Sequence, residues 1–127
     1  MRLRKMNSPA KASSLSAGRG RTRLTLSWQK LGDSFVVQIY NKNAHIGAVA
    51  VGDYEPNEKR VSTSVITRLG HKDDSIALKA AYAITKATGT PSCVIVGIHL
   101  DDITEDEIQA FLDISQSLVE RFLALVS

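Results

Sequence analysis

Three histidines, each close to a glycine, are the residues best suited to chemistry in this chain. His45 lies in Ala-His-Ile-Gly, His71 in Leu-Gly-His-Lys and His99 in Gly-Ile-His-Leu. Side chains two residues apart on a strand share a face, so Gly47 is expected beside His45 and Gly97 beside His99. A glycine within a strand often marks close approach by a ligand or another backbone. If the three imidazoles converge, they can bind a divalent transition metal ion with positions left open for a further ligand.

The spacing of the histidines leaves a second interpretation open. The intervals between them match no local zinc motif such as His-Glu-x-x-His. Carboxylates follow two of the histidines closely, and these are Asp73, Asp74, Asp101 and Asp102. They would hold the imidazoles in one tautomer or add metal ligands, but they would also serve simply as favourable charges at helix N-termini. From spacing alone, a shared metal site and three unrelated histidines both remain open.

The other candidate residues are cationic or nucleophilic side chains near these motifs. Arg68 and Lys72 flank His71, and either can contact a phosphate group or be merely solvated. With Gly47 and Gly97 they form the set expected at a cofactor site. Cys93 lies inside an apolar run and is expected to be an inert thiol. No Gly-x-Ser-x-Gly, Walker or dinucleotide motif occurs, and no acid–base pair has convincing spacing, so we predict no catalytic residue.

Charge divides the chain into a basic tail and an acidic body. Residues 1–23 contain seven Lys or Arg and no acid, whereas the remainder has nine Lys or Arg and thirteen Asp or Glu, a net charge of −4. This distribution argues against a specific nucleic-acid-binding domain, although the tail can attract polyanions. Residues 1–20 are rich in Ser, Ala, Gly and Arg and are expected to be disordered. Residues 21–127 have a length and composition typical of a single domain.

Compartment and membrane association are constrained by the same composition. The single cysteine cannot form an intrachain disulfide, which fits a reducing compartment, and we expect a cytoplasmic protein. No apolar run approaches the roughly 20 residues required to cross a bilayer. A basic N-terminus without an apolar segment after it does not indicate export.

Hydrophobic periodicity predicts the order ββββαβα. Turn residues separate segments with the alternation of strands, and the short turns that join the first four strands favour an antiparallel meander. Gly89 and Pro91 end a helix, and Thr104 with Glu107 forms a capping box that begins another, running through Val126. We expect an α+β fold with a mixed five-stranded sheet and both helices packed on one face. The predicted strands are residues 22–30, 34–40, 45–51, 61–67 and 92–98, and the first helix is residues 74–88.

Three phrases carry a resemblance to a known family. These are HIGAVAVG at 45–52, LGHKDD at 69–74 and VGIHLDD at 96–102. In this order they resemble the LpdD-like prenylated flavin chaperones, which include the small third component of gallate and other hydroxyarylic acid decarboxylase systems. The resemblance covers about residues 22–125 and implies a fold like that of the proteasome-assembly chaperones. It does not extend to the basic tail.

The resemblance implies a function for the histidines. Such proteins are thought to bind prenylated FMN with help from a metal ion and to serve a UbiD-type decarboxylase. The family motifs fall on His45, His71 and His99, which the resemblance implies are ligands of a divalent transition metal ion. It also implies a small homo-oligomer, expected to be a homodimer, with a flavin prenyltransferase as a further possible partner.

Two other functions remain open from the sequence. In one, the chain is a decarboxylase subunit that contributes directly through His99 or His71, or one that binds no metal. In the other, it is a protein–protein interaction module of assembly-chaperone type, the histidines are incidental, and the sheet face without helices binds a partner. The lack of a convincing acid–base pair favours an accessory protein over an enzyme.

Overall fold

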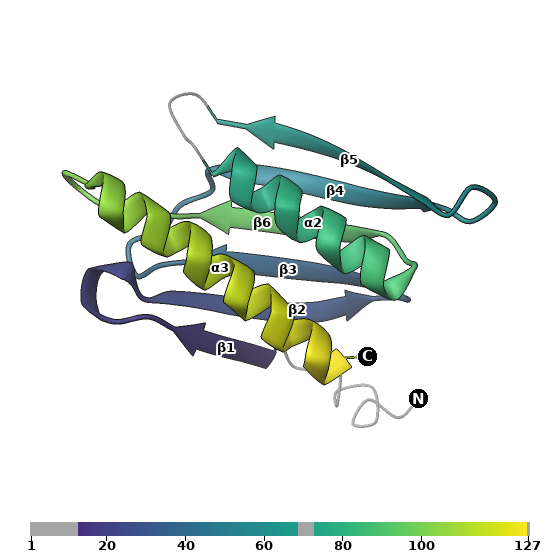
Figure 1. Cartoon of the computed structure of the whole chain (residues 1–127), viewed down its shortest axis with the longest axis horizontal. Coiled ribbons are helices and arrows are strands. Elements are labelled where there is room, and N and C mark those ends of the chain that lie inside the picture. The colour runs from purple at the N-terminus through teal and green to yellow at the C-terminus, as the bar shows by residue number, and fades with distance from the viewer. Residues whose placement is uncertain (1–12, 69–72, 127) are drawn as a thin grey trace, which may run out of the picture.

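The fold is one mixed sheet covered on one face by two helices (Figure 1). The computed structural model describes residues 13–68 and 73–126. In this part of the chain the six strands have the spatial order β1-β2-β3-β6-β4-β5. The strands are β1 Ser13–Ala17, β2 Leu24–Leu31, β3 Ser34–Tyr40, β4 Ala48–Glu55, β5 Arg60–Thr67 and β6 Ser92–Gly97; the helices are α2 Asp74–Thr88 and α3 Glu105–Val126, and η1 is a 3-10 turn at Gly20–Thr22.

Strand β1 corrects the prediction of five strands and of disorder through residue 20. It pairs antiparallel with β2, with Leu15 opposite Leu26. Leu15 and Ala17 pack against the hydrophobic core. Backbone hydrogen bonds hold an edge strand to its neighbour, and only one of its faces has to be apolar. A segment rich in serine can therefore form such a strand. The prediction of disorder is therefore wrong for residues 13–20, and residues 1–12 lie outside the described part.

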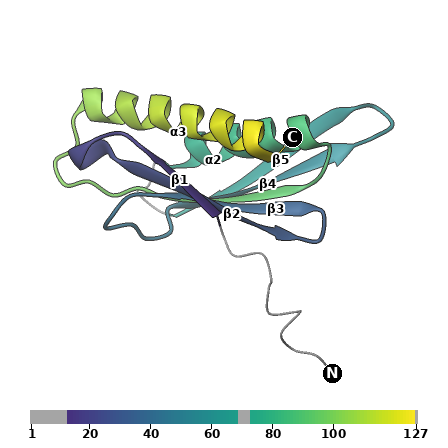
Figure 2. The same cartoon turned by 90° about the horizontal axis from the view of Figure 1, so that it is seen from below.

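The central position of β6 corrects the predicted meander. Strands β2 and β3 form one antiparallel hairpin, and β4 and β5 form another. Strand β6 lies between them, parallel to β3 and antiparallel to β4. Its side chains alternate between the core face under the helices, where Val94 and Val96 are fully buried, and the opposite face, where Cys93 and Ile95 are partly buried. The predicted α+β class, mixed sheet and helices on one face are confirmed, as the side view in Figure 2 shows.

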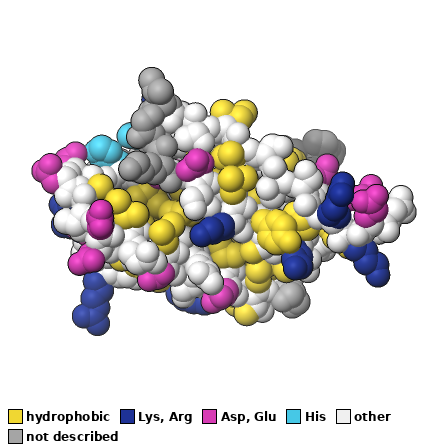
Figure 3. Space-filling view, turned by 45° about the horizontal axis from the view of Figure 1, so that its top comes forward, with side chains coloured by type: hydrophobic (Ala, Val, Ile, Leu, Met, Phe, Trp, Pro, Cys, Tyr) yellow, Lys and Arg dark blue, Asp and Glu magenta, His cyan; other side chains and the backbone are white. Residues whose placement is uncertain are grey.

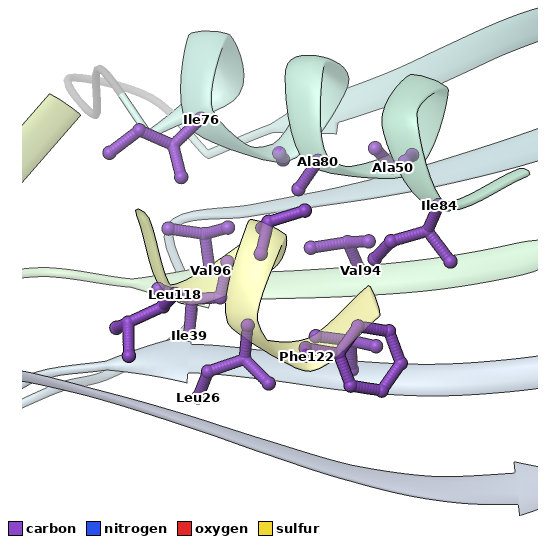
Figure 4. Close-up of a cluster of buried hydrophobic side chains, with 14 of the residues drawn as sticks. Leu26, Ile39, Ala50, Ile76, Ala80, Ile84, Val94, Val96, Leu118 and Phe122 are labelled. Atoms are coloured by element: carbon purple, nitrogen blue, oxygen red, sulfur yellow. The ribbon is translucent and has the colours of Figure 1, made fainter. Parts of the chain in front are cut away.

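The core lies between the sheet and the two helices (Figure 4). Alanines on α2, including the fully buried Ala77 and Ala81, let that helix approach β4 and β6 closely. Helix α3 contributes larger side chains, and Phe122 makes edge-to-face contacts with Trp28 and Phe35. This packing fixes the start of both helices over the sheet. Neither helix is long and apolar enough to cross a membrane.

Both helix ends follow from local sequence. Helix α2 begins at Asp74, as predicted, and ends where Gly89 takes a left-handed conformation with φ of 70°. The predicted capping box of α3 is confirmed: the backbone N–H of Glu107 donates to Thr104 Oγ1 at 3.1 Å, and that of Thr104 donates to Glu107 Oε1 at 3.0 Å. The N-termini of α2 and α3 lie at the same end of the sheet as the carboxyl ends of β3 and β6 (Figure 1).

Candidate functional site

Two of the three predicted histidines meet at the end of the sheet where β3 and β6 finish. His99 follows β6, and His45 lies in the segment before β4. Their ring centres are 5.4 Å apart, and both residues are exposed. Figure 3 shows the histidine side chains together at one end of the molecule, next to acidic side chains and a hydrophobic patch. The structure therefore brings His45 and His99 together, while His71 lies outside the described residues and the shared site of all three stays a prediction.

His45 does not start a strand, contrary to the prediction that a strand covers residues 45–51. Strand β4 begins at Ala48, because the backbone of His45 crosses directly over Gly97 instead of extending the ladder. A Cβ atom added at Gly97 would collide with the carbonyl oxygen of His45. The space beside Gly97 is thus filled by another backbone, one of the two explanations for a glycine within a strand. This close approach accounts for Gly97 without a ligand.

Gly47 and Arg68 hold the segment that carries His45. The N–H of Gly47, which is buried, donates to Val96 O at 2.8 Å. The N–H of Arg68 donates to Gly47 O at 2.8 Å, and its Nη1 donates to Ile46 O at 3.0 Å. These bonds tie the residues after His45 to both β6 and the end of β5. Direct contact of Gly47, Gly97 or Arg68 with a cofactor stays a prediction, and Lys72 lies outside the described residues.

Asn41, which sequence reasoning treated only as part of a turn, fixes the position of His99. Its side chain is 8% exposed. Its Nδ2 donates to His99 O at 2.7 Å, and its Oδ1 accepts from His99 N at 3.1 Å. The side-chain amide of Asn41 thereby makes the two hydrogen bonds that a neighbouring strand would otherwise make to His99, just past the end of β6. The signal in the sequence was an asparagine directly after an apolar strand, but the pairing of β3 with β6 was needed to find its partner.

The aspartates near the histidines have separate roles. Asp101 Oδ1 lies 3.0 Å from His99 Nε2, so it is the predicted carboxylate partner of that imidazole. Asp73 is buried, and its Oδ2 accepts from the backbone N–H of Ile98 at 3.2 Å. Asp74 accepts from Ser75 N within the first turn of α2 at 2.9 Å, and Asp102 is exposed. Two carboxylates thus support the backbone and ring of the segment around His99, one from each side.

An apolar cavity of about 450 Å³ opens beside both histidines. Its lining comes from the start of α2, the first turns of α3 and the residues that follow β6. Asp73 is the one carboxylate that lines it. Apart from His45, Asp73 and His99, its lining is apolar: Ile76, Ile98, Leu100, Ile103, Ile108, Phe111 and Leu112.

A second, polar recess of about 670 Å³ shares His99 and Leu100 with the apolar cavity. Its remaining wall comes from η1, the start of β2, the end of β3 and the turn that follows. A third hollow of about 320 Å³ lies beside His45, lined also by residues of β3 and β6. The residues that line the polar recess, besides the shared pair, are Gly20, Arg21, Arg23, Thr25, Tyr40, Asn41, Lys42, Asn43 and Asp101.

Arg21 forms a fixed part of the polar recess. Its Nε donates to Glu107 Oε2 at 2.8 Å, and its Nη2 donates to Asp101 O at 2.8 Å. The hydrogen bond from Arg21, with a further one from the Thr104 backbone, lowers the pKa of Glu107 from 4.5 to about 2. The charge of Arg21 is therefore compensated, and the pair fastens η1 to the beginning of α3.

Two of the three histidines predicted to bind a metal ion lie close together in the described residues. Two imidazoles bound to one tetrahedral ion would have ring centres about 5 Å apart, close to the 5.4 Å between His45 and His99. Residues 13–68 and 73–126 contain no group of three or more His, Cys, Asp or Glu side chains arranged to hold a metal ion. The predicted site of His45, His71 and His99 therefore depends on His71 and stays a prediction.

Cys93 lies on β6, away from the histidine end. It is partly buried, and burial raises the pKa of its thiol. Its strand neighbours are Val36 on β3 and Val51 on β4. A raised pKa lowers the fraction of reactive thiolate, in agreement with the prediction of an inert thiol.

Comparison with known proteins identifies the family. The sequence model of the prenylated flavin chaperone LpdD-like domain matches residues 18–127. The chain belongs to this LpdD-like family. The match includes the segments that carry all three histidines. No curated protein sequence matches the chain.

The LpdD-like fold is also similar to that of a solved assembly chaperone. The related structure is described as the crystal structure of a novel chaperone complex for yeast 20S proteasome assembly. The similarity has a TM-score of 0.60 at 14% sequence identity, and it covers 91% of this chain and 94% of the other. At this identity the likeness concerns the fold alone. The expected resemblance of the LpdD-like domain to proteasome-assembly chaperones is confirmed in that respect.

Proposed function

We propose that this LpdD-like protein binds prenylated FMN and delivers it to a UbiD-type aromatic acid decarboxylase. The observation that carries the proposal is the junction at His99 of an apolar cavity and a polar recess. Prenylated FMN has the same division, with a flat, largely apolar ring system at one end and a charged phosphate at the other. When bound in a decarboxylase, the prenylated ring supplies the electron sink for loss of carbon dioxide. Here the residues need only hold and protect it.

The dimensions and lining of the site suit a carrier. Small-molecule sites typically have volumes of about 300–1,000 Å³ and mostly apolar walls with a few polar groups, as the apolar cavity has. Both histidines are nevertheless exposed, so the site is open to solvent. An enclosed active site excludes water to strengthen its electrostatics, whereas a carrier must release its ligand. The open arrangement thus favours a chaperone over an enzyme.

Flavin binding and transfer can be tested together. We expect anaerobic titration of the purified protein with prenylated FMN to change the absorbance spectrum of the flavin with saturation near one ligand per chain. The loaded protein should then activate an apo UbiD-type decarboxylase faster than free cofactor does, while the loaded chain alone turns over no aromatic acid. Turnover by the loaded chain alone would favour the decarboxylase-subunit hypothesis. No spectral change at any concentration would contradict the proposed function.

We further propose that a divalent transition metal ion held by His45, His71 and His99 assists this binding. The 5.4 Å separation of the His45 and His99 rings and the carboxylate of Asp101 beside His99 support this role. Metal content of the untagged protein should be close to one ion per chain and should fall to background in His99→Ala. Asn43→Ala, in the nearby exposed turn, is the matched control and should retain the metal. Absence of metal after reconstitution would return the histidines to structural roles.

A second candidate function is that of a protein-interaction module, and this function is compatible with flavin binding. The sheet face opposite the helices carries apolar side chains, among them Val51 and Ile66, which are 49% and 78% exposed. Exposed apolar patches on a soluble protein often mark interfaces, and homodimerisation through this face would cover them. Analytical ultracentrifugation of wild type and Ile66→Lys tests this: a dimer that dissociates in the variant supports an interface there. If the protein forms a complex with a decarboxylase and a metal chelator does not disrupt it, that result would favour an interaction module that needs no metal.

A further inference from the structure

The polar recess contains two cations that no carboxylate in the described residues neutralises. Of the basic side chains that line it, Arg21 is paired with Glu107. Arg23 and Lys42 form no salt bridge with a described residue, and Arg23 makes only a long hydrogen bond of 3.5 Å to Gly18 O. The single carboxylate in the lining, Asp101, is already beside His99 Nε2. The recess therefore has a surplus of positive charge on an otherwise acidic domain.

The fold explains why these two cations face the same hollow. Leu24 and Leu26 point into the core and are fully buried, so alternation along β2 places Arg23 and Thr25 on the opposite side. Lys42 lies in the turn after β3, next to the Asn41 side chain that clamps His99. Strand β2 pairs with β3, with Thr25 opposite Tyr40, so the start of one strand lies beside the end of the other. Tyr40 adds a neutral hydroxyl group to the wall, and the hydroxyl of Thr25, which also lines it, is hydrogen-bonded to Ser16 Oγ at 3.0 Å.

We propose that this recess binds a phosphate monoester, through Arg23 and Lys42, and that the ester is the phosphate of the flavin mononucleotide. The identity of the ester rests on the proposed function. The flavin rings then occupy the apolar cavity, and the ribityl chain passes His99, which lines both spaces. Two charged donors and adjacent hydroxyl groups are the usual means of holding a phosphate in proteins.

Arg68, which the sequence singled out for phosphate contact, is a weaker choice in the structure. Its guanidinium donates to Ile46 O, and its backbone N–H donates to Gly47 O. Arg68 does not line the polar recess or the apolar cavity. Because Arg68 also holds the segment that carries His45, the matched control for Arg23→Gln and Lys42→Gln is Lys86→Gln, which removes one exposed positive charge in the last turn of α2.

The first experiment detects the phosphate site without prenylated flavin. Two-dimensional amide NMR of the full chain is recorded during titration with inorganic phosphate, FMN and riboflavin. We expect phosphate and FMN to shift the amides of residues 41–43 and of Arg23, and the doubly substituted Arg23→Gln/Lys42→Gln protein to lose these shifts. Riboflavin, which lacks the phosphate, should leave the amides of Arg23 and residues 41–43 unshifted. Equal shifts with riboflavin, or shifts centred on residues 66–68, would overturn the assignment.

The second experiment measures affinity for prenylated FMN in the same variants. Loss of one hydrogen-bonded charge should weaken binding about tenfold for Arg23→Gln and for Lys42→Gln, while Lys86→Gln should stay within about twofold. Circular dichroism confirms that each variant is folded. Unchanged affinity in both recess variants, with binding by the wild type intact, overturns the inference alone. Failure of the wild type to bind prenylated FMN, with the phosphate shifts retained, overturns the flavin assignment and the proposed function but leaves the anion site.

Discussion

At each end of β6 a glycine allows another segment to pack against the sheet more closely than a side chain would permit. At its start, Ser92 lies opposite Gly52 of β4, and a Cβ at Gly52 would collide with Thr85 Oγ1 of α2. At its other end, a Cβ at Gly97 would collide with the carbonyl of His45. Both glycines are buried and admit a close neighbour. Gly52 allows helix α2 to pack closely against the sheet, and Gly97 allows close approach of the loop that carries His45.

The surroundings of the two glycines differ sharply in polarity and exposure. Near Gly52, Thr85 and Ser92 are almost fully buried and bond to each other at 2.8 Å, which closes that end. Near Gly97, the imidazoles of His45 and His99 are exposed, and hollows open on both sides of the sheet end. Polar groups at the closed end are buried and bond to one another, whereas the two imidazoles at the histidine end are exposed to solvent. This contrast indicates that stability and binding are separable by mutation.

The largest expected effect is that of Gly97→Ala compared with Gly52→Ala. Each inserts a methyl group against fixed atoms and should lower the free energy of unfolding by about 1–3 kcal/mol, measured by urea denaturation. Only Gly97→Ala displaces His45, so it alone should weaken prenylated-FMN binding, by about tenfold or more. Equal binding losses in the two variants, measured where both are folded, would contradict the division between the two ends.

Asn41→Ala should have the next largest effect, at the histidine end. The substitution removes two partly buried hydrogen bonds and leaves the N–H and C=O of His99 without the side chain that pairs with them. We expect a loss of about 1–3 kcal/mol in the free energy of unfolding and a broadened His99 amide signal in NMR spectra. Asn43→Ala is the control from the same turn, and it should change stability by no more than about 0.5 kcal/mol. A sharp, unshifted His99 signal in Asn41→Ala would refute the clamp.

The sequence predicted the elements better than their order in the sheet. Residues 74–88 and the capping box at Thr104 follow local rules of spacing and capping, and both are confirmed. The position of β6 between two hairpins, and the pairing of β1, depend on contacts between distant residues that periodicity does not encode. The same limit applies to the site. The histidines were visible as residue types, whereas Asn41 and the surplus charge of Arg23 and Lys42 became visible only once β2, β3 and β6 were side by side.

Thr85→Val tests the closed end with a smaller expected effect. It removes the hydrogen bond to Ser92 while nearly preserving volume, and Ser92 keeps an acceptor in Ala81 O at 3.3 Å. We expect a loss of about 1 kcal/mol in the free energy of unfolding, with ligand binding unchanged. In the double variant Thr85→Val/Ser92→Ala, the two losses should be less than additive because the removed groups were partners. Full additivity would show that the two hydroxyl groups do not interact.

The smallest expected effect is the pH dependence contributed by Glu107 at the edge of the polar recess. Its pKa in the folded protein is about 2, below the ordinary value of 4.5, because Arg21 and Thr104 donate hydrogen bonds to the carboxylate. A lowered pKa means that the folded state favours the charged form. The resulting stabilisation is complete above about pH 5 and disappears as the pH falls through 4.5 towards 2. Glu107→Gln should therefore be less stable than wild type at pH 7, and the difference should shrink in urea unfolding at successively lower pH.

The same pair also connects stability to the site, since Arg21 bonds to Asp101 O as well as to Glu107. In Glu107→Gln the guanidinium of Arg21 loses its compensating charge, which raises the positive potential of the polar recess. If Arg23 and Lys42 hold a phosphate there, this variant should bind inorganic phosphate at least as tightly as wild type despite its lower stability at pH 7. Weaker phosphate binding in Glu107→Gln would mean that the position of Arg21, rather than the charge in the recess, controls the anion.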